Sequence, residues 1–413
     1  MNKKVMAFAF FISLGLFFSY AFSHPISQET TITNKDDVTI VSNPKTPCPK
    51  NGIPIRIEFE EELSIGVEEG NEEYIFGNRI YFNTDVDGNF YVNDWDKKCI
   101  RKFAPDGKYL LAIGRPGQGP GEFQNVWHPR FDINNNLYVS DIVGSRRITH
   151  FDKRGTFLKQ IRVPIRLSNI YINSLGLYIG YQSTVIEDPK KGDSVISVLG
   201  LFDTQFHLLS EINRDVHNFS SPTGRGAKSR AAYLANILSE DAFKPTSNFL
   251  VAENDFIYFG FPELYEIEVY SPDGKLSRII QRSYDPIKIN KKHKDDYIRY
   301  QDDEFLRFLR APDQEIKKDI IKLVKYPKHL PPYMNFTLME NGWLAVVVDA
   351  IEGDYTIFDL FDEEGRYIAH FKASIPMANL FFKNGKVYAL AIVNDYRYVK
   401  RYNFEIQEKR NDK

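Results

Sequence analysis

The strongest constraint on the fold is a repeated unit that occurs six times along the chain. Each copy carries a strand of β-branched and aromatic residues, a loop, a second such strand and a turn of the Asp-Gly type. Gly, Asn and Asp adopt the turn geometry readily, and the flanking runs suit a half-buried strand. The copies lie at residues 87–108, 134–155, 177–203, 257–274, 341–365 and 384–402.

Four short antiparallel strands per copy, repeated six times, predict a β-propeller. One blade cannot cover its own apolar faces, so the blades must stack in a ring. We therefore expect an all-β fold, a six-bladed β-propeller with four-stranded antiparallel blades over residues 55–408. The sixth copy ends after three strands, and residues 55–66 are predicted to supply its closing outer strand and so remove an open sheet edge. Residues 409–413 are predicted to be a polar tail.

One stretch of the chain resembles a known repeat. Residues 114–123 (GRPGQGPGEF), then His128-Pro129, then LYVSD at 137–141 and Arg147-Ile148, are similar to an NHL repeat. The chain is also similar to exported six-bladed propellers of bacteria. The resemblance implies a six-bladed ring in which the connectors between blades share one face with the loop between the two middle strands. It implies little about chemistry, because such propellers include both binding proteins and enzymes.

The first residues have the layout of a secretory signal peptide. Lys3 and Lys4 precede an apolar run from Val5 to Phe22, and small residues stand where a peptidase would cut. We predict a signal peptide over residues 1–23, with an uncleaved membrane anchor as the alternative. After cleavage we expect no stable membrane span and a periplasmic or extracellular protein. Residues 24–54 are polar and contain five prolines, so they are predicted to be an extended leader.

The chain has two cysteines, too few for a disulfide framework or a four-cysteine zinc site. In an oxidising compartment Cys48 and Cys99 could form a disulfide that ties the leader to the propeller. The alternative is two free thiols, because the sequence does not give the Cα separation that a disulfide needs.

Long connectors fall in positions that the resemblance places on one face, where function is usually found on loops held by a rigid scaffold. The connector 284–333 carries an amphipathic helical pattern and is predicted to be a helical insertion between blades 4 and 5. It could form a lid or a docking surface, or merely cover the propeller flank. Residues 219–230 are predicted to be a flexible basic loop, either solvated or binding an anion through Arg225, Lys228 and Arg230.

Several of the predicted inner strands start with Asn, which would place amide groups around the mouth of the central channel. Amides both donate and accept hydrogen bonds and suit polar ligands such as sugars or peptides. The alternative is structural, because Asn also bonds to nearby backbone at turns. The candidate ligand-binding residues, at this mouth and on the loops of the same face, are Arg115, His128, Arg130, Asn169, Asn248, Asn335 and Asn379.

The same positions argue against a catalytic metal centre. Zinc needs three protein ligands, and His128 is the one histidine among the mouth positions. Calcium accepts amide oxygens but normally also takes carboxylates, which the sequence does not pair with the Asn positions. There is no Gly-x-Ser-x-Gly motif, and we assign no catalytic residue and no cofactor. Asp94 and Asp141 are predicted to form ion pairs within their blades, with Arg101 and Arg147.

These observations favour a binding module over an enzyme. We expect an exported NHL-like propeller whose decorated face takes a polar ligand, such as a sugar or peptide, or a protein partner. The alternative is a calcium-dependent propeller hydrolase, lactonase- or esterase-like, with its centre at the channel mouth. Nucleic acid is not an expected partner, because removing two lysines with the signal peptide lowers the formal charge from -2 to -4.

Overall fold

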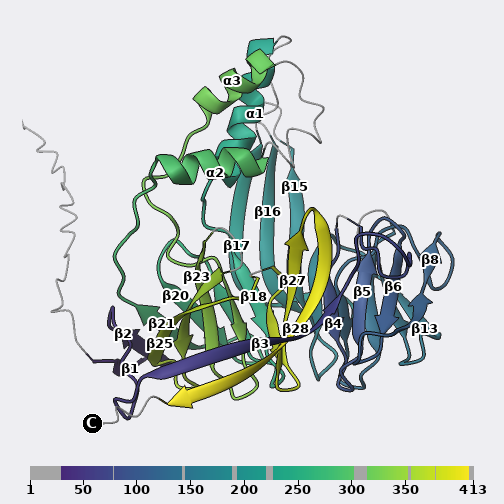
Figure 1. The fold of residues 1–413 in the computed structure, drawn as a ribbon, viewed down its shortest axis with the longest axis horizontal. Coiled ribbons are helices and arrows are strands. Elements are labelled where there is room, and N and C mark those ends of the chain that lie inside the picture. The colour runs from purple at the N-terminus through teal and green to yellow at the C-terminus, as the bar shows by residue number, and fades with distance from the viewer. Residues whose placement is uncertain are drawn as a thin grey trace, which may run out of the picture.

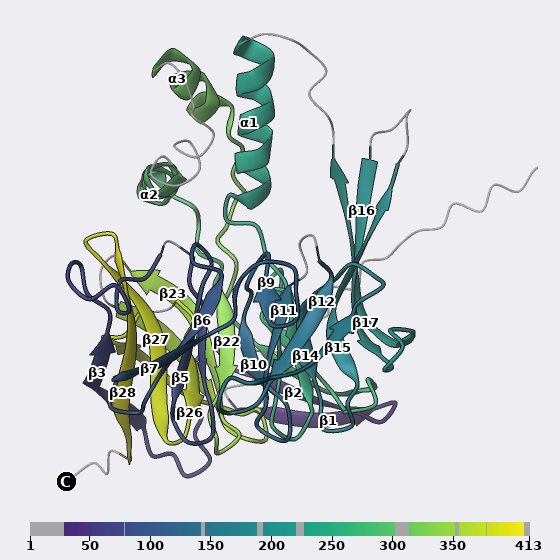
Figure 2. The ribbon, with the colours of Figure 1, turned by 90° about the vertical axis from the view of Figure 1, so that its right-hand side faces the viewer.

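The computed structural model describes residues 29–408 except 78, 142–144, 188–192, 220–226, 302–313, 352–354 and 377. Six antiparallel sheets form the blades of a propeller, as the sequence predicts (Figures 1 and 2). The predicted signal peptide and the polar tail 409–413 lie outside the described residues.

The blades follow one another along the chain, each from its inner to its outer strand. Blade 1 contains β4 (Phe82–Thr84), β5 (Phe90–Asp94), β6 (Cys99–Phe103) and β7 (Tyr109–Ile113). Blade 2 contains β10 (Pro129–Phe131), β11 (Leu137–Asp141), β12 (Arg147–Phe151) and β13 (Phe157–Arg162). Blade 3 contains β14 (Leu167–Ile172), β15 (Tyr178–Ile186), β16 (Asp193–Phe202) and β17 (Leu208–Phe219). Blade 4 contains β18 (Asn248–Val251), β19 (Ile257–Gly260), β20 (Glu266–Tyr270) and β21 (Leu276–Arg282). Blade 5 contains β22 (Asn335–Leu338), β23 (Leu344–Ile351), β24 (Tyr355–Phe361) and β25 (Tyr367–Ala373). Blade 6 contains β26 (Phe381–Lys383), β27 (Lys386–Val393), β28 (Tyr396–Glu408) and β3 (Ile55–Ile65).

A side-chain hydrogen bond recurs in the turns between strands. Asp85 Oδ1, at the end of β4, accepts from the backbone N–H groups of residues 87 and 89, at 3.0 and 2.8 Å. Asp132 repeats this contact in blade 2, and Asp152 repeats it in the next turn. Such bonds favour a turn over continued strand, so the repeat seen in the sequence is largely a repeat of turn chemistry.

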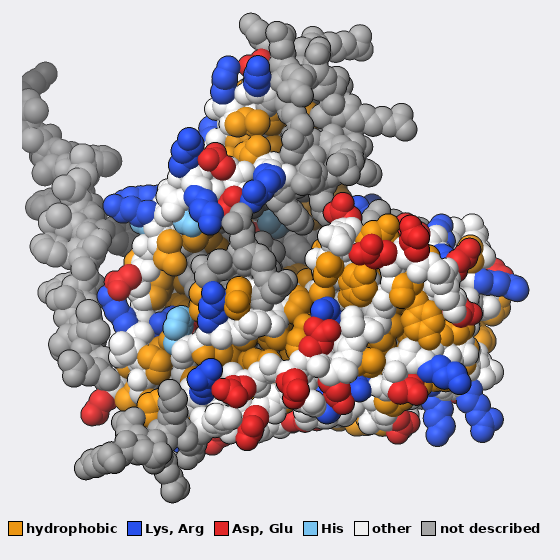
Figure 3. Space-filling view, in the orientation of Figure 1, with side chains coloured by type: hydrophobic (Ala, Val, Ile, Leu, Met, Phe, Trp, Pro, Cys, Tyr) orange, Lys and Arg blue, Asp and Glu red, His pale blue; other side chains and the backbone are white. Residues whose placement is uncertain are grey.

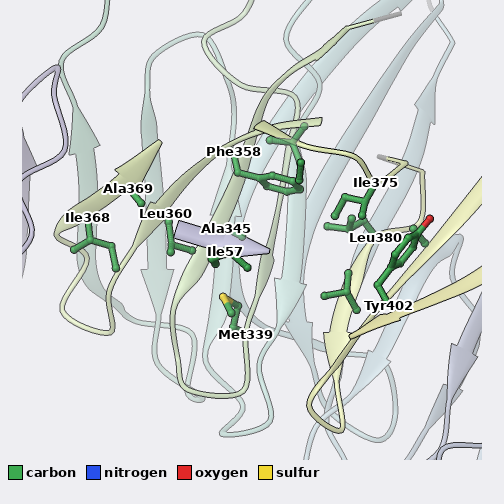
Figure 4. Packing of buried hydrophobic residues seen from close by; sticks show 14 residues of the cluster. Ile57, Met339, Ala345, Phe358, Leu360, Ile368, Ala369, Ile375, Leu380 and Tyr402 are labelled. Carbon is green, nitrogen blue, oxygen red and sulfur yellow. The ribbon is translucent and has the colours of Figure 1, made fainter. Parts of the chain in front are cut away.

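The apolar core lies between neighbouring blades. Between blades 5 and 6, Phe358 and Leu360 of β24 share one cluster with Leu380 and Val387 of blade 6, and all four are buried (Figure 4). β3 adds Ile57, which is 4% exposed, to the same cluster. Full burial of such a side chain contributes about 1.5–3 kcal/mol, so a blade is stable only against its neighbours.

The ring is closed by strands from opposite ends of the chain. β3 pairs antiparallel with β28, from Val399 opposite Ile65 to Glu408 opposite Ile55, and the two run side by side in Figure 1. β3 therefore occupies the place expected for the closing strand and covers an edge that would otherwise be open.

The leader differs from the extended segment expected from its composition. Within it, β1 (Thr31–Lys35) and β2 (Val38–Asn43) form a hairpin, and β2 pairs parallel with β21, so that blade 4 has six strands. Asp36 and Asp37 both have positive φ, 48° and 64°, which matches a two-residue hairpin turn. Because this hairpin pairs with a strand remote in sequence, local composition gives little sign of it.

The helices of the described chain stand on the face from which the connectors rise (Figure 2). The predicted insertion contains α2 (Lys291–Gln301) and α3 (Gln314–Leu323). α1 (Ala227–Asp241) begins within the stretch 219–230 that was expected to be a flexible loop, and its Leu234 and Leu238 are buried against Ile320 of α3. The buried residues of the α3 stripe, Ile320 and Val324, thus share one apolar cluster with α1.

Charged side chains cover much of this helical cap. Lys and Arg gather over α2 and α3 in Figure 3.

Among the described residues, no helix combines the length and apolar character that crossing a bilayer requires. Arg225 lies outside the described residues, and the side chains of Lys228 and Arg230 do as well, so the suggested anion-binding loop is not described.

The two cysteines are free thiols, which corrects the suggested disulfide. The backbone N–H of Cys48 donates to Tyr367 O at 2.7 Å, which holds Cys48 beside blade 5. Cys99 begins β6 in blade 1 and is buried, and burial raises the pKa of its thiol. The leader therefore fastens to blades 4 and 5 by hydrogen bonds and not to blade 1 by a covalent bond.

Candidate functional site

A cavity of about 380 Å³ opens between blades 2 and 3, where the inner strands β10 and β14 begin. The strands of each blade alternate in direction, so these starts lie on the face that carries the connectors and helices. The cavity is lined by Trp127, His128, Arg130, Ser140, Ser168, Asn169 and Ile170.

Backbone contacts hold both walls of the cavity. On the blade 2 side, Asn93 Nδ2 of blade 1 donates to Val126 O at 2.8 Å, and the Trp127 N–H donates to Ser140 O at 3.3 Å. In blade 3, the pairing of β14 with β15 shifts between Ser168 and Tyr171, and Asn169 has a φ of 52°. Asn tolerates this left-handed conformation better than most residues, so it suits this bulge.

Arg130 crosses from blade 2 to blade 3. Its Nη2 donates to Asn169 Oδ1 at 2.7 Å, and its guanidinium carbon lies 3.5 Å from the centre of the Tyr171 ring. Its buried Nε has no hydrogen-bond partner among the described residues. The guanidinium is thus positioned by an amide and an aromatic face, and its positive charge has no counter-ion among the described residues.

His128 is packed against an aromatic ring instead of a carboxylate. The centre of its imidazole lies 3.8 Å from the centre of the Tyr81 ring. Burial, and to a lesser extent the positive charge of Arg130, lower the pKa of His128 to about 3. The imidazole is therefore neutral at physiological pH, and it offers one donor and one acceptor.

Aromatic side chains continue behind His128. Trp127 stacks on Tyr81 with ring centres 6.3 Å apart, and Trp95 meets Trp127 edge-on at 5.0 Å. The buried Nε1 of Trp127 has no hydrogen-bond partner among the described residues. This wall is apolar with one unused donor, a composition common in small-molecule sites.

Of the predicted site residues, the structure brings His128, Arg130 and Asn169 together in the cavity. Asn248 and Asn379 instead join neighbouring blades: Asn248 Nδ2 donates to Met334 O, and Asn379 Nδ2 donates to Phe82 O, both at 3.0 Å. Asn335 Oδ1 accepts from the Phe336 N–H at 2.8 Å. These three side chains follow the structural alternative, because their amide groups bond to nearby backbone.

Arg115 also lies away from the cavity. It belongs to β8 (Arg115–Pro116), which pairs with β9 (Glu122–Phe123) in the loop between blades 1 and 2. Its side chain is exposed and forms an ion pair with Glu122 at 2.8 Å. That contact fixes the shape of the loop and leaves Arg115 outside the candidate site.

The cavity includes residues that the sequence did not single out, namely Trp127, Ser140, Ser168 and Ile170. Trp127 had a usable signal, since it directly precedes His128 at the predicted start of an inner strand. Ser140 and Ile170 had no such signal, because each belongs to an ordinary strand pattern. They line one cavity only because blades 2 and 3 lie side by side.

The predicted ion pairs within blades 1 and 2 are confirmed. Asp94 pairs with Arg101, and Asp141 pairs with Arg147 at 3.5 Å. Arg147 also donates to two backbone carbonyls of the loop before blade 2, each at 2.6 Å. These arginines are nearly inaccessible and belong to the scaffold.

No group of three or more His, Cys, Asp or Glu side chains suited to a metal ion occurs in the described part of the chain. The lining of the cavity itself contains no carboxylate and carries the positive charge of Arg130. Such a lining suits a ligand with acceptor groups better than it suits a cation.

Comparison with known proteins agrees with the fold. The model of the DUF5128 family, described as a 6-bladed beta-propeller, matches residues 71–220. No curated protein sequence matches the chain. Among solved structures, the chain is similar to a Bacteroides fragilis protein named as exported, with 13% identity, 90% of this chain and 100% of that chain covered, and a TM-score of 0.48.

Two further solved structures show the same level of similarity. A member of the DUF4221 family from Bacteroides vulgatus is 10% identical over 86% of this chain and 99% of that chain, with a TM-score of 0.49. Virginiamycin B lyase from Staphylococcus aureus is 10% identical over 84% of this chain and 99% of that chain, with a TM-score of 0.42. From its six sheets and the family match, the chain is a six-bladed β-propeller.

Proposed function

We propose that this protein is an exported, NHL-like propeller that binds a small polar ligand, such as a sugar or a short peptide, between blades 2 and 3. The observation that carries the proposal is the cavity of about 380 Å³, which joins an aromatic wall to a few convergent polar groups. Small-molecule sites typically occupy about 300–1,000 Å³ and have this mixed lining.

The chemistry of the cavity favours binding over catalysis. A general base works best with a pKa near the operating pH, whereas the pKa of His128 is lowered to about 3. The two lining hydroxyl groups, of Ser140 and Ser168, have no hydrogen bond to His128, so neither resembles an activated nucleophile. Ligand binding requires neither a general base nor an activated nucleophile.

The test is a thermal-shift screen of the mature chain against sugars and short peptides, with isothermal titration of any hit. A ligand that binds the folded state raises the Tm by mass action. Ser168 is an exposed residue at the rim, so Ser168→Trp should fill the mouth without disturbing the core. Leu175→Trp is the matched control, because Leu175 is 69% exposed in a turn of the same blade and outside the cavity.

We expect a ligand that stabilises the wild type and Leu175→Trp but not Ser168→Trp. The proposal is wrong if every stabilising ligand acts equally on Ser168→Trp, or if the screen yields no ligand.

A further inference from the structure

The arginines of this protein differ in how their charge is balanced. Arg101, Arg147 and Arg282 are largely buried, and each faces the carboxylate of an aspartate: Asp94, Asp141 and Asp359 respectively. Arg130 is also partly buried, yet no carboxylate of the described residues lies within ion-pair distance of it. Burying a charge without a partner is costly, and Arg130 combines a buried, unpartnered Nε with a place in the cavity lining, so its surroundings need an explanation.

The groups around Arg130 do not supply the missing negative charge. Asn169 contributes a neutral oxygen to one of the five guanidinium N–H groups, and Tyr171 contributes a ring face. His128 is uncharged at neutral pH. Within the described lining, the cavity therefore carries one positive charge and no negative charge.

The buried polar side-chain atoms of this lining that lack a described partner are hydrogen-bond donors. Two buried donors of the lining, Arg130 Nε and Trp127 Nε1, have no partner in the described chain. The unpartnered Nε is not decisive alone, because Arg282 Nε is also unpartnered although Arg282 pairs with Asp359. The combination of unused donors with an unbalanced charge is what sets this cavity apart.

We propose that the cavity binds the oxyanion of a small organic ligand, a carboxylate or a phosphate, with Arg130 as its counter-ion and Asn169 as the residue that orients the guanidinium. This inference rests on the proposed function and narrows its ligand class to acidic compounds. Planar guanidinium groups bind such oxyanions through paired, charge-assisted hydrogen bonds. The Trp127 side chain, which lines the cavity, then contacts the less polar part of the ligand.

The experiment compares three probes that share a sugar ring: glucuronate, glucose 6-phosphate and glucose. Binding to the mature chain is followed by tryptophan fluorescence, because Trp127 lines the cavity and Trp95 contacts the Trp127 ring. The variants are Arg130→Gln, which removes the charge, and Arg130→Lys, which keeps it without the paired geometry. Arg154→Gln is the matched control, because Arg154 is an exposed arginine of the same blade and is not in the lining.

We expect saturable binding of at least one anionic probe and much weaker binding of glucose. Arg130→Gln should weaken the anionic probe about 10- to 100-fold, as the loss of a charge-assisted hydrogen bond implies. Arg130→Lys should fall between, and Arg154→Gln should match the wild type. Comparing glucuronate with glucose 6-phosphate shows whether carboxylate or phosphate is preferred.

The inference is overturned if glucose binds as tightly as the anions, if neither anion binds, or if Arg130→Gln retains wild-type affinity. The Ser168→Trp variant separates this failure from failure of the proposed function. A ligand that Ser168→Trp excludes and Arg130→Gln retains would leave a binding cavity but not an oxyanion site. An anion that binds equally to both variants would count against both.

Discussion

Two interfaces between neighbouring blades, called seams below, use the same kinds of side chain in opposite ways. Between blades 4 and 5, Arg282 lies over the Tyr367 ring at 4.3 Å and pairs with the fully buried Asp359 at 2.6 Å. Between blades 2 and 3, Arg130 lies over the Tyr171 ring at 3.5 Å and has no described carboxylate partner. Both arginines are held flat by an aromatic face, and only the first has its charge balanced by the chain.

The difference separates a structural arginine from one available to a ligand. Asp359 also accepts hydrogen bonds from the Tyr265 and Tyr367 hydroxyl groups, at 2.5 and 2.8 Å, so the first seam forms a network within the protein. The second seam opens instead into a cavity. Variants of the first seam should therefore cost stability, and variants of the second should cost ligand binding.

The largest expected effect is that of Asp359→Asn. Removing this carboxylate leaves Arg282 with an uncompensated charge in a nearly inaccessible position, and breaking a buried pair typically costs about 3–5 kcal/mol. We expect a loss of that size in the free energy of unfolding, measured by urea denaturation. The control is Asp273→Asn, which breaks the exposed pair with Lys275 and should leave the free energy of unfolding close to that of the wild type. Equal losses in the two variants would contradict the assigned role of the seam.

A second variant tests how the leader hairpin fastens the same seam. The buried Asn43 side chain donates to Gly365 O at 2.9 Å and to Gln281 O at 3.0 Å, and accepts from the Tyr367 N–H at 2.8 Å. Asn43→Ala should cost about 2–3 kcal/mol, because buried backbone groups of both blades lose their partner. In urea denaturation, Asn34→Ala at the exposed hairpin end should change stability by less than about 0.5 kcal/mol. A small loss for Asn43→Ala would mean that the hairpin does not support the seam.

A third variant tests the neutral histidine of the cavity seam through pH. The pKa of His128 is lowered to about 3 in the folded protein, against about 6.5 in an unfolded chain, so between these values the unfolded chain binds a proton that the folded chain does not. Stability therefore falls as the pH drops below about 6.5. Between about pH 7 and pH 5, the wild type should lose about 1–2 kcal/mol more than His128→Gln in urea denaturation. Identical pH slopes for the two proteins would show that His128 is not held neutral.

The smallest expected effect on folding is that of Arg130→Gln. Because no described carboxylate depends on Arg130, its loss leaves no buried negative charge behind. We expect a change of less than about 1 kcal/mol in the free energy of unfolding, measured alongside Asp359→Asn. A loss comparable with that of Asp359→Asn would make Arg130 a structural residue like Arg282.

Much of the scaffold is predictable from the sequence because it depends on local repeats. The turn residues and alternating strands indicate six blades, and the unfinished sixth copy indicates a closing strand near residue 55. The Asp94–Arg101 pair is predictable for the same reason, since both residues lie in neighbouring strands of one blade.

Features that join distant segments are not predictable in this way. Asp359 and Arg282 belong to different blades, and no periodicity relates their positions. The buried face of α1 packs against α3, a helix that follows all of blade 4 and α2 in the chain. The Asn positions at the strand starts were located correctly, but the sequence could not show that Asn248 and Asn379 use their amides to join blades.

The most direct test of the account is a crystal structure of the mature protein grown with glucuronate or glucose 6-phosphate, whichever binds more tightly. The account predicts the oxyanion within hydrogen-bond distance of the Arg130 guanidinium, with the sugar ring beside Trp127. A carboxylate of the protein itself paired with Arg130, or a ligand bound elsewhere while the cavity is empty, would contradict it.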